Sequence, residues 1–526
     1  MARNREYKPL LFTTTVRNPE RIKRLLWLLK QFDGEELTDD LATKVVGELI
    51  RYGLYRPKKK TDSIKEKWQG TEQGAFGNTL LSDREVAWML EHNPQNHKEA
   101  GFAHGYASRF ATIFDFTKEL GFVYFKVGEP IEFSTIGTRY ASIIEVDVRR
   151  DNMLAITESH PEYETEAFLQ AMSRSQRKNP FVKVLNDNIP LVLLLRVIKL
   201  LNADPRNNNT GMSRRELPLL IFWKDNNAQA LYERIMKLRE EYGYTPSDEV
   251  ICDLCTEEIM EGAFKKFKPK SIMQEYPDEF IRKMRLTGLI TLRGAGRFID
   301  INHNEDKKVD YILSRYLTYQ TYTNERDYFD YMATVDSMLL SLSTVSPTTT
   351  QSQHLLNNWV GIYGWDNIKS ELQVLASGQN SSDDVLRLIP KPSRLEFLTA
   401  MAIKYNFPDV VVTPNYPTDD EGLPTSTAGG NSGDIECKEE HNGILVEVTM
   451  ASGRTQTIME IWPIERHLEK YQMRYPEAQC IFVAPSIFSD SRRQIEYVHH
   501  TKGHEIRPYK IADFITYLEQ SNTLYQ

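Results

Sequence analysis

The chain has 526 residues, 40% of them hydrophobic, and a formal net charge of −8. A chain of this length exceeds what one hydrophobic core normally accommodates, so we expect about three or four domains. No apolar run reaches the roughly 18 residues that a membrane-spanning helix needs, and Met1–Lys8 is too polar for a secretory signal. We therefore expect a cytoplasmic protein. Four cysteines argue against a disulfide framework, and Cys252 and Cys255 lack a second close pair for a zinc site.

The N-terminal region is basic although the whole chain is acidic. From Met1 to Gly70 there are 16 Lys and Arg residues against 10 Asp and Glu residues. The basic residues include Arg3, Arg5, Arg17, Arg21, Lys23, Arg24 and Lys58–Lys60. Such clusters favour binding to a polyanion through counterion release, whereas an ordinary solvated surface is the alternative interpretation.

A small unit of helix followed by hairpin occurs twice before residue 320. Each unit has an amphipathic helix, two short β-prone runs around a glycine-containing turn, and a closing helix. The segments are Ser108–Leu120, Phe122–Lys126, Ile131–Ser134 and Ile136–Ile144 in the first unit, and Glu279–Leu286, Leu289–Leu292, Phe298–Ile301 and Lys307–Tyr316 in the second. Helices that end in a hairpin are typical of a winged helix, in which one helix enters the major groove of DNA. We therefore expect N-terminal winged-helix-type DNA-recognition modules.

Candidate DNA contacts in these units are basic residues expected on exposed helix faces and hairpin tips. They are Arg109, Lys126, Arg174, Arg177, Lys178, Arg214, Arg215, Arg282, Arg285, Arg293 and Arg297. An arginine can donate two hydrogen bonds to guanine, while contacts to phosphate set position without reading sequence. An ordinary surface position is the alternative for each of them.

A helical connector and a polar linker are predicted between these units and the C-terminal part. Asp327–Leu342 has helical periodicity, and Ser343–Ser352 is polar. Pro414–Ser432 is rich in Pro, Thr, Gly and Asn, which predicts either an active-site loop ordered by DNA or a plain surface loop. Ala478–Pro485 is an apolar run typical of a buried central strand in a mixed sheet covered by helices.

Two acidic residues, Asp434 and Glu447, lie on a predicted β-hairpin. Ile444–Thr449 alternates apolar and polar residues, and Asn442-Gly443 is a tight-turn signal. With these two residues at the centre of the turn, side-chain alternation puts Asp434 and Glu447 on one face, where both could bind a hard cation such as Mg²⁺. A solvated face is the alternative, but an unpaired carboxylate in such an apolar strand is costly. The sequence therefore predicts a metal site.

Two further acids are candidates for the same site. Glu460 follows Glu447 by 13 positions, the interval that also separates Glu447 from Asp434, and lies in the helix-like run Thr457–Trp462. Glu396 lies in a second helix-like segment, Arg394–Ala400. A helix laid across the hairpin would bring Glu460 to the metal, and Glu396 would supply a fourth carboxylate.

Segments in this region resemble the D…ExK motif of the restriction-endonuclease-like nuclease fold, with Thr449 in place of the lysine. The segments are Ala428–Glu436, Val446–Thr449, Thr455-Gln456, Met459-Glu460 and Arg466-His467. Their order and spacing are similar to those of the AlwI-type restriction endonucleases, whose relatives include the nicking enzyme BstNBI. The resemblance implies a type IIS restriction endonuclease, which binds a short asymmetric site in double-stranded DNA and hydrolyses phosphodiester bonds a few base pairs outside it.

The resemblance also implies roles for individual residues. Asp434, Glu447, Glu460 and the backbone of Val448 would bind Mg²⁺, for which Mn²⁺ could substitute, and Glu396 would complete or support the site. Thr449 and His467 would be accessory catalytic groups. No lysine is in place to orient the attacking water, so Thr449, Gln456 or a hydroxide on the metal could do this, and these alternatives stay open.

The implied architecture is a multidomain protein of the α+β and α/β classes. We expect two winged-helix-like subdomains at residues 1–155 and 156–305, a helical linker at 306–355, and a PD-(D/E)XK-like nuclease domain at 356–526, with a mixed sheet flanked by helices. The implied partners are DNA, a second nuclease domain in a transient dimer, and a cognate DNA methyltransferase of a prokaryotic restriction-modification system. Two alternatives stay open, a strand-specific nicking enzyme of the same family and a non-catalytic winged-helix DNA-binding regulator.

Overall fold

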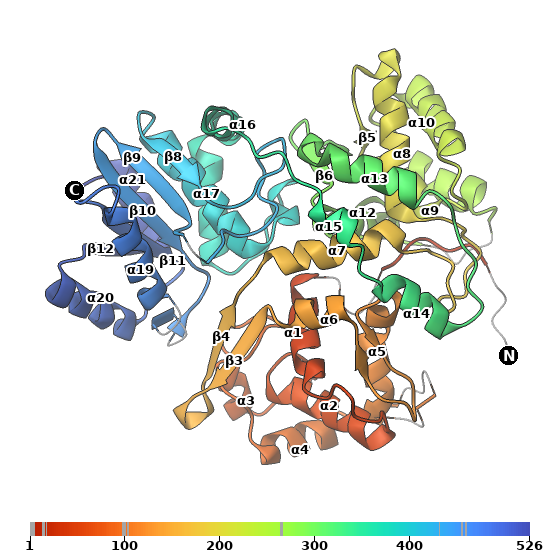
Figure 1. The fold of residues 1–526 in the computed structure, drawn as a ribbon, viewed down its shortest axis with the longest axis horizontal. Helices are drawn as coiled ribbons and strands as arrows, with labels where there is room; N and C mark the ends of the chain where they lie inside the picture. Colours follow the sequence, from red (N-terminus) through yellow and green to blue (C-terminus); the bar gives the residue numbers. More distant parts are fainter. Residues whose placement is uncertain are drawn as a thin grey trace.

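The computed structural model describes residues 1–526 except 1–5, 13–15, 17, 97–100, 103–104, 263–266, 431, 454–455 and 458–459. Of the residues named above, Arg3, Arg5, Arg17, Asn431, Thr455 and Met459 lie outside this description. The protein combines helices and sheets, and the C-terminal sheet, in blue, lies to the left of the N-terminal parts in Figure 1. Within the described ranges, no helix has the length and hydropathy to cross a membrane.

The first helix–hairpin unit is present as predicted. The elements of this part are α1 (Glu20–Lys30), α2 (Asp39–Arg51), α3 (Asp62–Lys67), α4 (Asp83–His92), α5 (Gly105–Glu119), β1 (Val123–Tyr124), β2 (Glu132–Phe133), α6 (Thr135–Ala141), β3 (Ile144–Val148), β4 (Leu154–Glu158) and α7 (Glu162–Arg174). Helices α2 and α4 begin after Thr38 and Ser82, whose hydroxyls cap the first turn. Strands β1 and β2 are antiparallel and pair Val123 with Phe133, which confirms the predicted hairpin. Helix α6 ends earlier than predicted because Ile144 begins β3, which pairs with β4.

The second helix–hairpin unit is also present. Its elements are α8 (Pro190–Ala203), β5 (Met212–Ser213), α9 (Leu217–Phe222), α10 (Ala228–Tyr242), α11 (Asp248–Asp253), α12 (Tyr276–Arg285), β6 (Ile290–Arg293), β7 (Phe298–Ile301) and α13 (Asp306–Arg315). Strands β6 and β7 are antiparallel, and β5 adds a third strand beside β7. The turn between β6 and β7 contains Gly294 and Gly296, whose positive φ angles a glycine adopts without steric cost. The assignment of both units as winged helices stays a prediction.

The segment predicted as a linker is shorter than expected. Helices α14 (Glu325–Ala333) and α15 (Ser337–Ser341) cover most of the predicted connector. The linker prediction is wrong in its second half, because Thr348 forms a capping box with Gln351 and α16 (Thr349–Ala376) continues from it. The expected boundaries at 155/156 and 355/356 fall inside β4 and α16, so the division into four parts stays a prediction.

A five-stranded mixed sheet forms the centre of the C-terminal part. Its elements are α17 (Lys391–Asn406), β8 (Val411–Pro414), β9 (Ile435–Glu439), β10 (Asn442–Val448), α19 (Ile461–Gln472), β11 (Gln479–Ala484), α20 (Ser489–Lys502), β12 (Ile506–Lys510) and α21 (Ile511–Gln520). The strand order is β12-β11-β10-β9-β8, with β10, β11 and β12 parallel and the remaining pairs antiparallel. Strand β11 is buried inside the sheet, which confirms the predicted strand over Ala478–Pro485.

Alternate residues of β10 pack against different helices. Ile444 and Val446 belong to the hydrophobic cluster that includes Phe397 of α17 and Phe514 of α21. Leu445 belongs to the cluster that includes residues of α19 and α20. The sheet is therefore covered on both faces. A polar side chain on β10, such as Glu447, needs polar partners because apolar clusters lie on either side of the strand.

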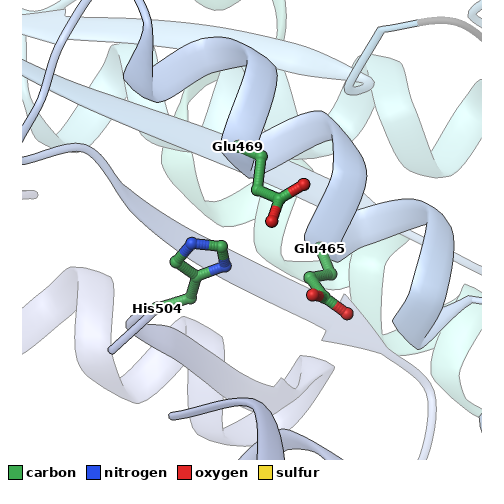
Figure 2. Close-up of side chains that lie close together, drawn as sticks. All are labelled: Glu465, Glu469 and His504. Carbon is green, nitrogen blue, oxygen red and sulfur yellow. The ribbon is translucent and has the colours of Figure 1, made fainter. Parts of the chain in front are cut away.

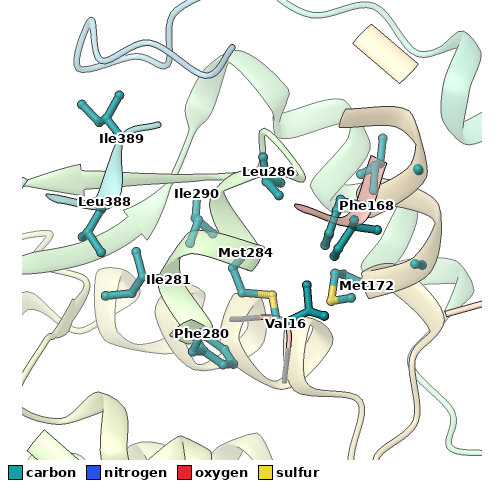
Figure 3. Close-up of a cluster of buried hydrophobic side chains, with 14 of the residues drawn as sticks. Val16, Phe168, Met172, Phe280, Ile281, Met284, Leu286, Ile290, Leu388 and Ile389 are labelled. Carbon is teal, nitrogen blue, oxygen red and sulfur yellow. The ribbon is translucent and has the colours of Figure 1, made fainter. Parts of the chain in front are cut away.

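The N-terminal and C-terminal parts share one hydrophobic cluster, so packing as well as the connecting chain holds them together. Figure 3 shows Ile281 of α12 near Leu388, which precedes α17, and Phe280, Met284 and Ile389 belong to the same cluster. All of these side chains are buried. The C-terminal part is therefore packed against the second helix–hairpin unit.

The segment between β8 and β9 is anchored to that second unit through an acidic loop, Asp419–Glu421. Arg293 of β6 forms an ion pair with Asp420 at 2.6 Å and another with Glu421. Arg285 of α12 lies 3.5 Å from Asp419, which is fully buried. Ion pairs between residues more than 120 positions apart in the sequence thus hold this segment in place.

Three of the candidate DNA-contacting arginines are buried, so their assignment to exposed faces is wrong. Arg174, Arg177 and Arg285 are 2%, 7% and 6% exposed. The Arg174 guanidinium donates to the carbonyl oxygens of Tyr331, Met332 and Thr334 at the end of α14. A buried guanidinium needs such acceptors, because it carries five donors and a charge that burial would otherwise leave uncompensated.

Replacing Arg174 tests its structural role. We expect Arg174→Met to lower the free energy of unfolding by about 3 kcal/mol, because the last carbonyl groups of α14 lose a charged donor. The control is Arg297→Met, which removes an exposed guanidinium and should change stability by no more than about 0.5 kcal/mol. Equal unfolding midpoints for the two variants in urea would contradict this role.

Candidate active site

The pairing of β9 with β10 brings Asp434 and Glu447 together. The register pairs Asn442 with Glu439 and Val446 with Ile435, so Asp434 falls opposite Glu447 just beyond the last pair. The turn between the strands is at Glu440-His441, and the prediction of a turn centred on Asn442-Gly443 is wrong. The turn lies two positions earlier, and a shift of two keeps the alternation of faces, so the two carboxyl groups still meet.

Hydrogen bonds fix both side chains. The backbone N–H of Val448 donates to Asp434 Oδ2 at 2.7 Å. Glu447 Oε1 lies 2.9 Å from Nδ1 of His467 in α19, and His467 Nε2 lies 3.2 Å from the carbonyl oxygen of Gly430. Since a carbonyl oxygen can only accept, Nε2 donates in this arrangement. His467 therefore connects Glu447 to the loop that precedes Asp434.

The other two predicted acids reach the same place from different elements. Glu460 lies at the N-cap of α19 and accepts a hydrogen bond from Thr449 Oγ1 at 2.8 Å. Its expected position inside a helix is wrong by one residue, because α19 begins at Ile461. Glu396 of α17 accepts from the backbone N–H of Ala428 at 3.1 Å.

The four carboxyl groups disfavour one another's charged forms. Burial raises the pKa of Glu396, Asp434 and Glu447 well above the ordinary value, and it also raises the pKa of Glu460. Repulsion adds to burial, from Asp434 on Glu396, from Glu447 on Asp434, and from Glu460 on Glu447. Glu447 and Glu396 are 6% and 4% exposed, whereas Asp434 and Glu460 are partly open to solvent.

Among the described residues, the cluster lacks a compensating lysine or arginine. In the part of the chain that the structure describes, no lysine or arginine forms an ion pair with Glu396, Asp434, Glu447 or Glu460. Burial lowers the pKa of His467, so this side chain is a weak source of positive charge. Buried carboxylates without a basic partner are costly, and oxygen ligands of this kind suit a hard divalent cation. The donor chemistry of these carboxyl groups therefore suits a divalent metal ion.

A second group of potential metal ligands does have a protein cation beside it. Figure 2 shows Glu465, Glu469 and His504, which each offer one ligand atom within 4.8 Å of the others. Lys502 forms an ion pair with Glu465 and lies 3.0 Å from Glu469 Oε1. A protein cation already compensates these carboxylates, so nothing in this second group calls for a metal ion.

The structure narrows the choice of group that orients the attacking water. Gln456 is fully buried, and its amide donates to the carbonyl oxygens of Ala451 and Ser486 and accepts from the N–H of Phe488. The Gln456 alternative is therefore wrong, because both ends of its amide anchor loops. The Thr449 hydroxyl is also engaged, since it donates to Glu460 and accepts from the N–H of Ala451.

The remaining candidate DNA contacts separate into two groups. Five arginines are engaged within the protein: Arg214 and Arg215 pair with Asp278 and Asp248, Arg293 pairs with Asp300, Asp420 and Glu421, Arg282 donates to the Arg387 carbonyl oxygen, and Arg109 donates to Gln95. Three others, Lys126, Lys178 and Arg297, have partly or fully exposed side chains.

Gly433 is a residue of the site that the sequence prediction missed. A Cβ at this position would lie 2.4 Å from Leu445 Cδ1 and 2.8 Å from Glu447 Oε1. A larger residue at this position would therefore force the Leu445 side chain and the Glu447 carboxyl group to move. The signal in the sequence is a glycine directly before the acid of a strand, where close backbone approach is one explanation.

The protein belongs to the AlwI restriction endonuclease family, whose model matches residues 118–389 and 365–517, more than half of the chain. No curated protein matches the chain. Among solved structures, the chain is similar to the small subunit (R.BspD6I2) of the heterodimeric restriction endonuclease R.BspD6I, with 23% identity over 30% of this chain and 78% of that chain and a TM-score of 0.26. It is also similar to restriction endonuclease FokI, with 11% identity, coverage of 95% and 94%, and a TM-score of 0.26, and to FokI bound to DNA, with 12% identity, coverage of 99% and 96%, and a TM-score of 0.24. TM-scores this low do not establish that the chain shares the fold of these proteins.

Family membership decides the class of protein. The chain is an enzyme, a site-specific deoxyribonuclease, and DNA is its substrate. Restriction endonucleases generally use divalent metal ions, in agreement with the uncompensated carboxylates described above. The alternative of a non-catalytic regulator is therefore not retained.

Replacing Gly433 tests the geometry of the hairpin. We expect Gly433→Ala to displace the Glu447 carboxyl group and to lower DNA cleavage by about tenfold or more, with a loss of stability of about 1–3 kcal/mol. Gly429→Ala is the matched control, because no atom lies within 4 Å of a Cβ at that position. Cleavage by Gly433→Ala at the rate of this control would contradict the close approach.

Proposed function

We propose that the protein is a Mg²⁺-dependent type IIS restriction endonuclease. It would bind a short asymmetric site in double-stranded DNA and cut a few base pairs outside that site. The observation that carries the proposal is the cluster of four carboxyl groups, two buried and two partly exposed, without a lysine or arginine partner among the described residues. Such a cluster is costly alone and favourable around a divalent cation.

Asp434, Glu447 and Glu460 are the proposed ligands of the metal ion, together with the backbone of Val448. When bound, the ion supplies positive charge beside the phosphate and lowers the pKa of a water molecule. The partly exposed Asp434 and Glu460 would lie toward the DNA, and the buried Glu447 and Glu396 would lie behind them. Glu396 would not bind the metal ion itself but would influence Asp434, because the two carboxylates repel each other.

His467 is proposed as a positioning residue. Its ring spans Glu447 and the carbonyl oxygen of Gly430, so it fixes the carboxyl group relative to the loop before Asp434. The Thr449 hydroxyl fixes Glu460 in the same way. These contacts hold the acids in one geometry before DNA arrives, which reduces the reorganisation that the reaction requires.

DNA recognition is proposed for the two helix–hairpin units, as winged-helix-type modules. One chain offers one such carboxylate cluster among its described residues, so one binding event would cut one strand. A double-strand break would then need a transient dimer or a second binding event, and a strand-specific nicking enzyme is the second candidate. A cognate methyltransferase would protect the host DNA in either case.

The first experiment is incubation of supercoiled plasmid with the purified protein and Mg²⁺, with Ca²⁺ in a parallel reaction. Linear fragments with fixed ends would support the double-strand endonuclease, and open circles with one fixed break would support the nicking enzyme. Intact plasmid in the presence of Mg²⁺ would contradict both proposals. Sequencing of the ends gives the distance between the bound site and the cut.

Removal of one proposed ligand should separate cutting from binding. We expect Asp434→Asn to lower the cleavage rate by about 10³-fold or more, since a metal ion contributes several kcal/mol to the stabilisation of the transition state. Binding to DNA that carries the site should persist, because Asp434 lies outside the two helix–hairpin units proposed to bind the site. A matched control is Glu436→Gln, two positions along the strand, whose carboxylate pairs with Arg474. Cleavage by Asp434→Asn at the rate of this control would contradict the assignment.

The raised pKa values of the carboxyl groups predict how stability depends on pH without metal. A carboxyl group with a raised pKa in the folded state stabilises the protein at pH values below about 4 and loses this contribution as the pH rises through the folded value. In EDTA the melting temperature of the wild type should therefore fall as the pH rises above about 4.

The same measurement with Asp434→Asn isolates the cluster from other titrating groups. The variant should melt at a higher temperature than the wild type at pH 8 in EDTA, by about 2–4 °C, because one repelling charge is gone. Mg²⁺ should raise the melting temperature of the wild type and leave that of the variant nearly unchanged. A variant that is less stable than the wild type in EDTA at pH 8 would contradict the repulsion.

A further inference from the structure

A groove with a volume of about 790 Å³ is lined by residues between Tyr124 and Arg326, far from the carboxylate cluster in sequence. Three segments line it: the β1–β2 hairpin around Lys126, the loop around Lys178 and Lys183, and the chain from Tyr319 to Arg326 at the start of α14. These segments are separated by up to about 200 positions in the sequence. In Figure 1, α14 lies on the side of the molecule away from the C-terminal sheet.

The residues that line this groove carry more positive than negative charge, whereas the whole protein is acidic. Four cations line it, Lys126, Lys178, Lys183 and Arg326, against two carboxylates, Glu129 and Glu325. The complete chain has a net charge of −8. A local excess of positive charge in an acidic protein attracts a polyanion without making the whole surface adhesive.

The groove cations are held loosely. Lys126 pairs with Glu129 at 2.6 Å, and these side chains are 59% and 43% exposed. Arg326 pairs with Glu132 at 2.5 Å and with Asp330 at 2.9 Å, and these three side chains are 45%, 50% and 53% exposed. Lys178 pairs with Asp187 at 3.1 Å, with side chains 37% and 50% exposed. Ion pairs this exposed add little to stability, so their cations can exchange a carboxylate for another anion. Lys183 is exposed and has no ion pair among the described residues.

Arg293, in contrast, is held by several carboxylates. Its guanidinium is 24% exposed and is shared among Asp300, Asp420 and Glu421. An arginine that already contacts three carboxylates has no free donor edge to offer to DNA. Arg293, Lys126 and Lys178 are equivalent candidates in the sequence, but only the two lysines keep side chains that DNA can reach.

The neutral lining of the groove is rich in hydrogen-bond donors. Thr321 and Thr323 are exposed, and the partly exposed Tyr322 lies between them. Hydroxyl groups of Thr and Tyr, together with Lys and Arg, make most protein contacts to DNA phosphates. This polar lining would give an apolar ligand few favourable contacts, and a compact monovalent anion could contact only part of it.

We propose that this groove binds the phosphate backbone of duplex DNA and so positions the recognition units on their site. The proposal rests on the function proposed above and adds to it the surface that holds the DNA. Contacts to phosphate set register without reading sequence. The groove would therefore contribute affinity for every DNA sequence, and base readout would belong to other residues.

The test is DNA binding at several salt concentrations with Asp434→Asn as the parent, so that the DNA stays intact. The test variant is Lys126→Ala with Lys183→Ala. Affinity should fall by about tenfold or more near 0.1 M salt, and the slope of log affinity against log salt should fall by about 2, because each lost phosphate contact changes it by about 0.9. The loss should be equal for DNA with and without the recognised site.

The matched control is Lys199→Ala with Lys307→Ala, which removes the same charge from two exposed lysines that do not line the groove. It should bind with nearly the affinity and the salt slope of the parent. Glu129→Gln gives the opposite test, because it frees Lys126 from its carboxylate and should tighten binding at low salt. A purely structural role of these residues would not produce this gain.

The outcomes separate this proposal from the function on which it rests. Equal affinities and equal salt slopes for the groove variant, the control and the parent would overturn the groove proposal while leaving the nuclease intact. A groove variant that loses affinity only for the recognised site would also overturn it, since that result indicates base readout. Failure of the wild type to bind or cut any DNA would instead contradict the proposed function.

Discussion

The antiparallel register between β9 and β10 is the constraint on which the carboxylate cluster depends. It sets Asp434 against Glu447 and directs the Val448 N–H to Asp434. The same strand carries apolar residues to the helices on both faces of the sheet, so the register cannot slip by one position without burying Glu447 among them. Packing of the sheet therefore maintains an arrangement of acids that, considered alone, is unfavourable.

The face shared by Asp434 and Glu447 could be predicted from the sequence, whereas the turn that creates it could not. Side chains alternate with a period of two, so any two-residue turn between the strands leaves Asp434 and Glu447 on one face wherever it lies, whereas a turn of three residues would have separated the two acids. Glu447 was identifiable because a carboxylate interrupts an apolar run, and the strand over Ala478–Pro485 because it lacks any interruption. The contribution of Gly433 depends on the distance to Leu445, which no pattern along the chain contains.

Arginines were the least predictable residues because their role depends on distant acceptors. Nothing near Arg174 in the sequence indicates that the end of α14 supplies its carbonyl partners, more than 150 positions later. The start of α16 was also hard to predict. A polar run that caps a helix has the same composition as a polar run that forms a solvated linker. The groove lined by Lys126, Lys183 and Arg326 could not be found from the sequence either, since three separate segments form it.

The acidic loop Asp419–Glu421 limits how far the two halves of the protein can be treated as interchangeable modules. Its three carboxylates are compensated by Arg285 and Arg293, which belong to the second helix–hairpin unit rather than to the C-terminal part. A chimera that joined this C-terminal part to a foreign recognition region would carry a buried Asp419 without its arginine, only 15 positions before Asp434. Redesign of specificity by exchange of whole regions must therefore transfer these two arginines as well, or neutralise the loop that they hold.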